Sequence, residues 1–269
     1  MTFPGAASDV ERADYVLVGA PLDASTTHLP GARFGPDRLR EFATPFDDYD
    51  RRTDQHFSDL GVADSGDLDP WTPTADYLNF LEGTLADARR AGAVPLLLGG
   101  EHTVTVAGVR AADPDVYVCL DAHLDLYEAY RGDEYSHATV TRHALDVAEE
   151  AVVLGARTGS EAEWDRATEA DVTVVAPEDV PEWTPDFGDR EVYLSVDVDA
   201  ADPAFAPGTG TMEPFGLAPR ELRDVVRSLA PGATGFDVVE VNDRDDGQAA
   251  ALGAKLLREF VFAHAALER

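Results

Sequence analysis

Short apolar runs alternate along this chain with segments in which apolar residues recur every three or four positions. The runs predict buried strands, and the three-to-four periodicity predicts helices packed on them. Strands are predicted at 15–19, 94–98, 116–120, 152–154, 172–175, 192–196 and 235–239. Helices are predicted at 35–42, 74–90, 103–111, 137–150, 161–168, 219–229 and 247–266. This alternation predicts an α/β fold, a three-layer α/β/α sandwich around a central parallel sheet.

Nothing in the pattern divides the 269 residues, since there is no linker, repeat or low-complexity run. We therefore expect a single domain spanning 1–269. No apolar stretch is long enough to cross a membrane, and the N-terminus lacks the regions of a signal peptide. Cys119 is the only cysteine and lies inside an apolar run, so an internal disulfide is excluded. A reducing cytoplasm is the expected setting.

The net charge of -31 argues against a nucleic-acid partner. Lys255 is the only lysine, and the acidic residues are spread over the whole chain. This composition is typical of adaptation to concentrated salt, where the screening length shrinks to about 3 Å and self-repulsion is tolerated. The hypothesis is that the protein comes from a salt-accumulating halophile.

Acidic residues and histidines follow three of the predicted strands. They are His102 after 94–98, Asp121, His123 and Asp125 after 116–120, and Asp197 and Asp199 after 192–196. On an extended backbone a spacing of two places side chains on one face, and the carboxyl ends of parallel strands share one edge of a sheet. Burying four carboxylates with two imidazoles is costly unless cations lie between them.

Four negative charges balance two divalent cations, which predicts a two-metal site. Oxygen-rich ligation with two imidazoles and no thiolate suits manganese, with zinc, nickel or cobalt as alternatives and magnesium less favoured. A single Asp-x-Asp after a strand is more often a loop start or a helix cap. The coincidence of three such segments favours the metal site.

Three segments resemble the signature motifs of the ureohydrolase family, which includes arginase, agmatinase, formimidoylglutamase and guanidinobutyrase. They are Gly-Gly-Glu-His at 99–102, Asp-Ala-His-Leu-Asp at 121–125, and the stretch 195–211. Residues 30–36 and 64–67 resemble two further family motifs. The resemblance implies an α/β/α sandwich that binds two manganese ions per subunit and attacks a guanidinium carbon with hydroxide. It also implies a homo-oligomer, a trimer or a hexamer.

The resemblance further implies a role for each candidate ligand. His102 and Asp125 would bind one ion, His123 and Asp199 the other, and Asp121 and Asp197 would bridge the two.

Two candidate catalytic residues come from further resemblances. Residues 135–139 are similar to the family segment whose histidine passes protons to the leaving amine, which implies that role for His137. Residues 238–242 are similar to the segment whose glutamate pairs with the substrate guanidinium, which implies that role for Glu240. Ordinary alternatives are a surface histidine at a helix start and a capping carboxylate at a strand end.

The chain departs from the family pattern at three positions, Ala138, Phe215 and Asp243. Ala138 and Phe215 replace glycines, and we expect Phe215 to narrow the mouth of the site. Asp243 replaces a proline. The other histidines, at positions 28, 56, 143 and 264, are expected in surface or packing roles.

The loop between Asp125 and His137 should select the small guanidinium substrate. It carries three acidic residues against one cation, Arg131, and its end is similar to that of agmatinases. We predict the reaction of agmatine and water to putrescine and urea. Formimidoylglutamase, guanidinobutyrase and arginase activities remain alternatives, in which Arg131 would bind a substrate carboxylate. A non-catalytic metal- or ligand-binding protein of this fold is the alternative of another class.

Overall fold

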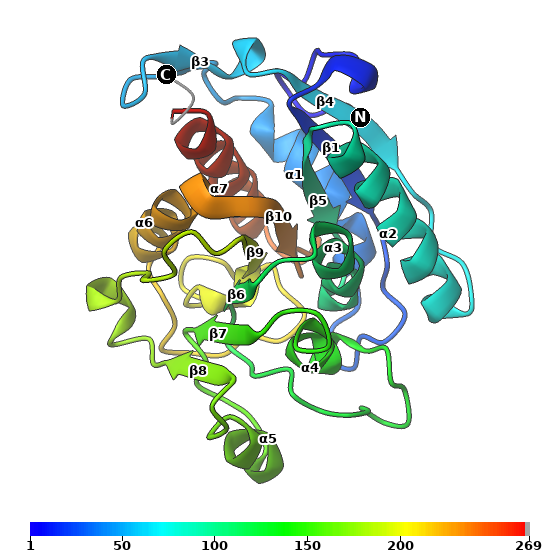
Figure 1. Cartoon of the computed structure of the whole chain (residues 1–269), viewed down its shortest axis with the longest axis vertical. Helices are drawn as coiled ribbons and strands as arrows, with labels where there is room; N and C mark the ends of the chain where they lie inside the picture. The colour runs from blue at the N-terminus through cyan, green and yellow to red at the C-terminus, as the bar shows by residue number, and fades with distance from the viewer. Residues whose placement is uncertain (267–269) are drawn as a thin grey trace.

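The computed structural model describes residues 1–266 and contains one large sheet of eight strands (Figure 1). Its strand order is β4-β1-β5-β10-β9-β6-β7-β8, and every pair in it is parallel. The strands are β1 (Tyr15–Ala20), β4 (Val62–Asp67), β5 (Val94–Gly99), β6 (Val116–Leu120), β7 (Glu150–Leu154), β8 (Val172–Val175), β9 (Val192–Asp197) and β10 (Ala233–Val239). A separate hairpin pairs β2 (Tyr49–Asp50) with β3 (Gln55–His56).

Seven α-helices accompany these strands within the described residues. They are α1 (Gly35–Ala43), α2 (Thr74–Arg90), α3 (Thr105–Ala112), α4 (Val140–Ala144), α5 (Glu161–Arg166), α6 (Pro219–Leu229) and α7 (Gln248–Ala265). Single 3-10 turns occur at Val10–Arg12, Ala32–Phe34, Phe57–Asp59, His102–Val104, His137–Thr139, Val180–Glu182, Val198–Ala200 and Ala230–Gly232. Within residues 1–266 none of the helices combines the length and hydropathy needed to span a membrane.

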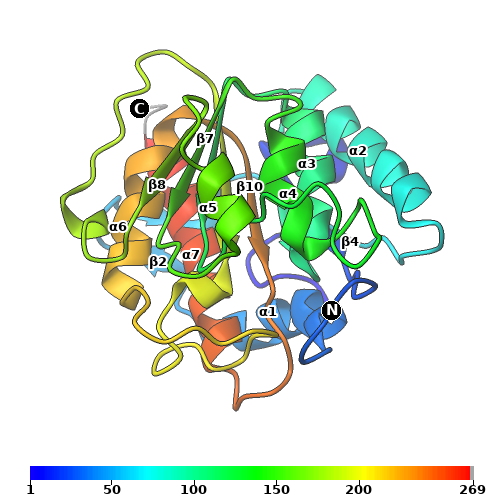
Figure 2. The same cartoon turned by 90° about the horizontal axis from the view of Figure 1, so that it is seen from below.

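The helices form a layer on each face of the sheet (Figures 1 and 2). Helices α1, α6 and α7 share one apolar core with strand residues such as Leu17 and Leu96. Helices α2, α3 and α4 share a second core with Val18 and Leu97. Successive strand residues point to opposite faces, and the six strands between the two edge strands contribute to both cores. The predicted three-layer sandwich is confirmed.

The helix predicted at 137–150 is wrong in length. The segment forms one 3-10 turn, the short helix α4 and then turns, because β7 already begins at Glu150. Glu150 pairs with Val116 of β6, and the amide of Glu149 donates to the carbonyl of Asp115. The register of the sheet therefore ends the helix early, and helical periodicity carries no information about that register.

Strand β4 was absent from the predicted strands because its second half is polar. It lies at the edge of the sheet beside β1 and carries the 64–67 motif. Arg40, which is 1% exposed, donates from Nε and Nη2 to the two carboxylate oxygens of Asp64, at 2.8 and 2.9 Å. Its Nη1 donates to Asp67. We call Arg40, Asp64 and Asp67 the Arg40 cluster.

Candidate metal centre

Polar residues gather where the four central strands β5, β10, β9 and β6 end. These strands are neighbours in the sheet, and their carboxyl ends lie at one edge. His102 follows β5, Asp121, His123 and Asp125 follow β6, Asp197 and Asp199 lie at the end of β9, and Glu240 follows β10. The carboxyl edge of a parallel sheet is where ligands usually bind in such folds.

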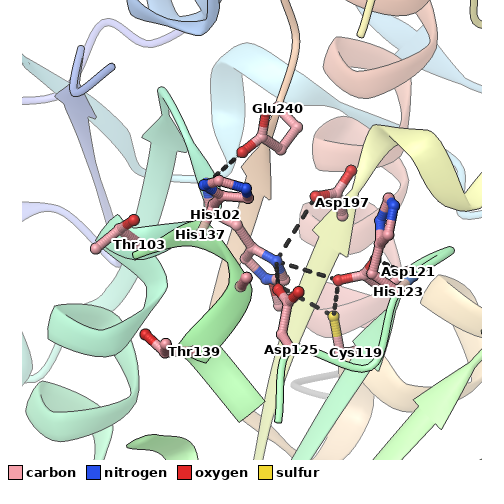
Figure 3. A network of polar contacts seen from close by, with 12 residues as sticks. His102, Thr103, Cys119, Asp121, His123, Asp125, His137, Thr139, Asp197 and Glu240 are labelled. Carbon is pink, nitrogen blue, oxygen red and sulfur yellow. Dashed lines mark hydrogen bonds and ion pairs between the residues drawn. The ribbon is translucent and has the colours of Figure 1, made fainter. Parts of the chain in front are cut away.

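A first group surrounds the ring of His102 (Figure 3). Its Nδ1 lies 2.9 Å from Asp125 Oδ2, 3.1 Å from Asp121 Oδ2 and 3.6 Å from Asp197 Oδ2. This nitrogen is buried and has no hydrogen-bond partner. Two ligand atoms that bind one ion at about 2.1 Å and at right angles lie about 3 Å apart. The spacing of the first group therefore fits a bound cation.

A second group surrounds the ring of His123. Its Nδ1 lies 3.1 Å from Asp199 Oδ2 and 3.4 Å from Asp121 Oδ1. Asp121 thus presents one carboxylate oxygen to each histidine, so the two groups share it. Asp197 turns Oδ2 toward His102, while its Oδ1 accepts the amide of Asp199 at 2.8 Å. The structure brings all six predicted ligands together, and Asp121 is the one placed between the groups.

The side chains converge through turns, so the expectation of an extended backbone is wrong. Strand β6 ends at Leu120, and Asp121 Oδ1 accepts the amide of His123 at 2.7 Å. The same two-residue turn occurs where Asp197 accepts the amide of Asp199. Asp125 has a left-handed backbone with φ of 52°, and Glu240 has φ of 61°. Such conformations cost on the order of 1–3 kcal/mol each for residues other than glycine and concentrate at functional sites.

The other ring nitrogen of His102, Nε2, contacts Ser195 on the side of the ring away from the carboxylates. Its Nε2 lies 3.2 Å from Ser195 Oγ, which donates to Asp237 Oδ1 at 2.6 Å. Because the serine hydrogen goes to Asp237, the serine oxygen accepts Nε2–H and leaves the lone pair of Nδ1 facing the carboxylates. Outer partners of this kind orient metal-binding histidines. Sequence reasoning missed Ser195 and Asp237, for which no local spacing gives a signal.

The carboxylates of the cluster lack sufficient positive charge from the chain. Burial, together with Asp121, raises the pKa of Asp125 to about 7. Burial and the neighbouring Asp199 raise the pKa of Asp197 well above its ordinary value. Burial also acts to raise the pKa of Asp121, but the neighbouring imidazoles of His102 and His123 lower it overall. A cluster that draws protons onto its carboxylates is one that divalent cations would stabilise.

Cys119 lies close enough to His102 and Asp121 to form a further possible ligand group with them. Its Sγ is 3.7 Å from Asp121 Oδ2 and 3.8 Å from Nε2 of His102, the nitrogen turned away from the carboxylates. Burial raises the pKa of the Cys119 thiol to about 12. The thiolate needed for metal binding is therefore disfavoured.

A cavity of about 420 Å³ lies against the two groups. It is lined by Thr26, Thr27, His28, His102, His123, Leu124, Asp125, Tyr127, Tyr130, Arg131, His137, Ala138, Thr158, Gly159, Ser160, Glu163, Asp197, Asp199, Gly210, Thr211 and Glu240. Its size suits a small molecule. The two predicted catalytic residues, His137 and Glu240, both lie in its wall.

These two residues have opposite electrostatic surroundings. Burial raises the pKa of Glu240 to about 8, and its Oε1 accepts the amide of His102 at 2.8 Å. Burial, and then the neighbouring His123 and His102, lower the pKa of His137 to about 4. Glu240 therefore favours a cationic partner, and the His137 ring is neutral at neutral pH.

Two sequence expectations about the cavity are wrong. Phe215 does not narrow the mouth, because it is 84% exposed and is not among the lining residues. Its backbone has a left-handed φ of 69°, a conformation that glycine adopts more readily than phenylalanine. His28 lines the cavity, although no ligand spacing had marked it. The remaining three histidines have structural contacts, since His56 pairs with Asp48, His143 stacks on Tyr135 and His264 contacts Tyr15.

A model of the arginase family matches residues 13–263. The chain belongs to the arginase family. It is therefore a hydrolase, and enzymes of this family bind a binuclear metal site.

Individual members of the family resemble this enzyme over almost its whole length. The agmatinase of Pyrococcus horikoshii is 33% identical over 93% of this chain and 91% of its own. The N(1)-aminopropylagmatine ureohydrolase of Thermococcus kodakarensis is 36% identical over 92% and 89%. The solved structure of the agmatine ureohydrolase of Thermoplasma volcanium superposes with a TM-score of 0.92 at 33% identity, covering 99% of this chain and 95% of the other.

Proposed function

We propose that this arginase-family enzyme hydrolyses agmatine to putrescine and urea. The observation that carries the proposal is the pair of ligand groups sharing Asp121 beneath a cavity that Glu240 also lines. The similarity to an agmatinase and to an agmatine ureohydrolase over nearly the full chain supports this substrate.

We assign the six ligands to two manganese ions. His102 and Asp125 would hold one ion, His123 and Asp199 the other, and Asp121 and Asp197 would bridge them. Carboxylates and imidazoles suit manganese, and the protonated Cys119 offers no soft ligand. Two such ions lower the pKa of water and supply hydroxide at neutral pH.

Glu240 would bind the substrate guanidinium through paired, charge-assisted hydrogen bonds. Its burial without a cation of its own supports this role, since a guanidinium would stabilise the charged carboxylate. His137 would deliver a proton to the leaving amine nitrogen as the carbon–nitrogen bond breaks. Its place in the cavity wall supports that role.

A guanidino acid is the second candidate substrate, and one observation favours it. Arg131 lines the cavity, with its guanidinium 5.6 Å from the centre of the Tyr130 ring. A cation at that place would attract a substrate carboxylate and repel the primary ammonium of agmatine. Glu163 is the acidic lining residue that is assigned neither to the metals nor to the guanidinium, and its carboxylate favours the amine.

A substrate panel tests the proposal directly. Urea release is measured from agmatine, arginine and 4-guanidinobutanoate, and formamide release from N-formimino-glutamate, with manganese in molar KCl. We expect the highest kcat/KM for agmatine, and a large loss for Glu240→Gln. A preference for a carboxylate substrate that disappears in Arg131→Ala supports the second candidate. Full metal occupancy with no turnover supports the non-catalytic alternative.

We further propose that the chain is a single domain, forms a trimer or hexamer, and works in the cytoplasm of a halophile. The net charge of -31 with a single lysine supports the salt adaptation. The melting temperature should rise steeply with KCl concentration. Equal stability in dilute and molar KCl contradicts the halophilic origin, and light scattering at molar KCl measures the oligomer.

A further inference from the structure

One buried carboxylate at this edge of the sheet has no part in the proposed reaction. Glu101 is 0% exposed and lies directly before His102. It accepts hydrogen bonds from the Ser25 amide at 2.7 Å, from Thr103 Oγ1 at 2.8 Å and from Ser25 Oγ at 2.9 Å. Ser25 Oγ is the donor in its bond to Glu101 Oε1, so the hydroxyl hydrogen of Ser25 is directed toward Glu101.

The same serine oxygen contacts His137 twice. Ser25 Oγ lies 3.0 Å from the His137 amide nitrogen and 3.0 Å from its ring Nδ1. With its hydrogen on Glu101, the oxygen has only lone pairs left for these contacts. Both are therefore donated by His137, which places a hydrogen on Nδ1. Ser136 Oγ is farther from Nδ1, at 3.4 Å, and accepts the amide of Ala138.

The loop that carries Ser25 is packed closely against the segment that carries Glu101. The amide of Glu101 donates to the carbonyl of Leu22 at 2.8 Å. A Cβ atom at Gly100 would lie 2.0 Å from that carbonyl oxygen, so glycine is required for this approach. The contact between Ser25 and Glu101 is therefore held by the backbone of two strand ends.

The second ring nitrogen of His137 is left available. Within residues 1–266, His137 Nε2 has no hydrogen-bond partner. The Tyr130 ring packs against the imidazole at 74°, with centroids 5.6 Å apart. A neutral imidazole with hydrogen on Nδ1 carries its lone pair on Nε2.

We propose that Ser25 is a positioning residue which, backed by Glu101, fixes the Nδ1–H tautomer of His137 and leaves Nε2 to exchange protons in the cavity. This inference rests on the proposed function, because it gives His137 the proton transfer. Nε2 takes a proton from solvent and delivers it to the leaving amine nitrogen as the carbon–nitrogen bond breaks. Nδ1 keeps its hydrogen throughout, and neither Ser25 nor Glu101 changes its protonation. The arrangement resembles a catalytic triad, in which a carboxylate orients a histidine, except that the Ser25 hydroxyl lies between Glu101 and His137.

The tautomer itself is the first test, and it needs no turnover. Nitrogen NMR of the full chain labelled with ¹⁵N-histidine, in molar KCl at neutral pH, separates protonated from unprotonated ring nitrogens. The ring-nitrogen signals that disappear from the spectrum of His137→Ala are assigned to His137. We expect hydrogen on Nδ1 of His137. Hydrogen on Nε2 overturns the proposal.

Variants then test the consequence for the reaction. A positioned proton donor contributes roughly 10²–10⁴-fold to kcat, and Ser25→Ala should remove at least about tenfold of this. The KM of Ser25→Ala should change less than about twofold. The alkaline limb of the kcat profile should move to lower pH, because the protonated ring loses its acceptor chain. Ser25→Thr should restore kcat and the profile. Ser65→Ala, which removes a hydroxyl bonded to Leu17 outside the cavity, should change neither.

The outcomes separate this inference from the proposed function. If His137→Ala keeps full kcat, the proton-transfer role fails, whatever the tautomer. If His137→Ala loses activity while Ser25→Ala retains kcat and an unchanged pH profile, the positioning role alone fails. The metal content and melting temperature of each variant show whether it is folded. If Ser25→Ala is misfolded, the tautomer measurement and the Ser25→Thr variant still test the positioning role.

Discussion

Two buried charged clusters lie in this molecule, and they differ in where their positive charge comes from. In the Arg40 cluster one guanidinium donates to two carboxylates. Burial acts to lower the pKa of Arg40, but the hydrogen bonds that it donates to Asp64 and Asp67 raise that pKa overall. The metal centre has four carboxylates around two imidazoles. There the pKa of Asp125 and that of Asp197 rise.

The direction of the pKa change teaches how to separate a structural cluster from a binding site. A cluster to which the chain supplies its own cation holds that cation in the charged form. A cluster that the chain leaves too negative binds protons, or cations where they are available. Both clusters are buried and acidic, so burial and composition alone do not distinguish them.

The largest effect is expected from Asp121→Asn, because this carboxylate serves both ligand groups. Mutating a residue that only hydrogen-bonds to a metal ligand lowers activity by up to roughly 100-fold, and urea release in Asp121→Asn should fall by more than this. Bound metal should drop from two ions per chain to one or none. Activity assays with elemental analysis measure both. Asp146→Asn, at an exposed carboxylate, is the control. Two ions and normal activity in Asp121→Asn would refute the shared role.

Arg40→Met should be the most destabilising change in the comparison. It leaves the buried carboxylate of Asp64 without its cation, which costs about 3–5 kcal/mol of unfolding free energy. Denaturant unfolding in molar KCl measures the loss. The folded variant should still bind two metal ions. A loss below about 1 kcal/mol, or a loss of metal binding, would contradict the separation of the two clusters.

The metal-free protein should lose stability as pH rises. Asp125 has a folded pKa of about 7 against an ordinary value of 3.8, so between these values the folded chain holds a proton that the unfolded chain has released. Stability is therefore greatest at the acidic side of this window and falls as pH approaches about 7. Thermal melts with and without manganese measure it.

The added cation should raise the melting temperature more at about pH 8 than at about pH 5, because binding requires the ionised carboxylates. Asp125→Asn should flatten the pH dependence, and Arg40→Met should leave its slope unchanged. A slope that persists in Asp125→Asn would assign the effect to other groups.

The smallest effect is expected at an exposed ion pair. Arg142 and Asp146 are in contact at 2.8 Å, with side chains 38% and 52% exposed. Arg142→Ala should change the unfolding free energy by no more than about 0.5 kcal/mol. A change comparable to that of Arg40→Met would mean that burial does not set the strength of these pairs.

The six ligand positions could be predicted from sequence because each lies within a few residues of a strongly apolar strand. Strands 116–120 and 172–175 and helices 74–90 and 219–229 were predicted with the bounds they have. The spacing of two marked residues that do lie close together, but turns rather than an extended backbone bring them together.

The remaining features depend on distant contacts. Ser25 contacts His137, which lies 112 residues away in the sequence. Asp237 acts on His102 through Ser195, and these residues are also far apart in the sequence. No local pattern marks such pairs. Strand β4 is polar because it is an edge strand that holds Asp64 and Asp67 for Arg40. The helix predicted at 137–150 was cut short by the register of β7.

The most direct test of the account is an anomalous-scattering map from crystals grown or soaked with manganese. We expect two peaks flanking the Asp121 carboxylate, one beside Nδ1 of His102 and one beside Nδ1 of His123. A single peak, or none at this edge of the sheet, would contradict it.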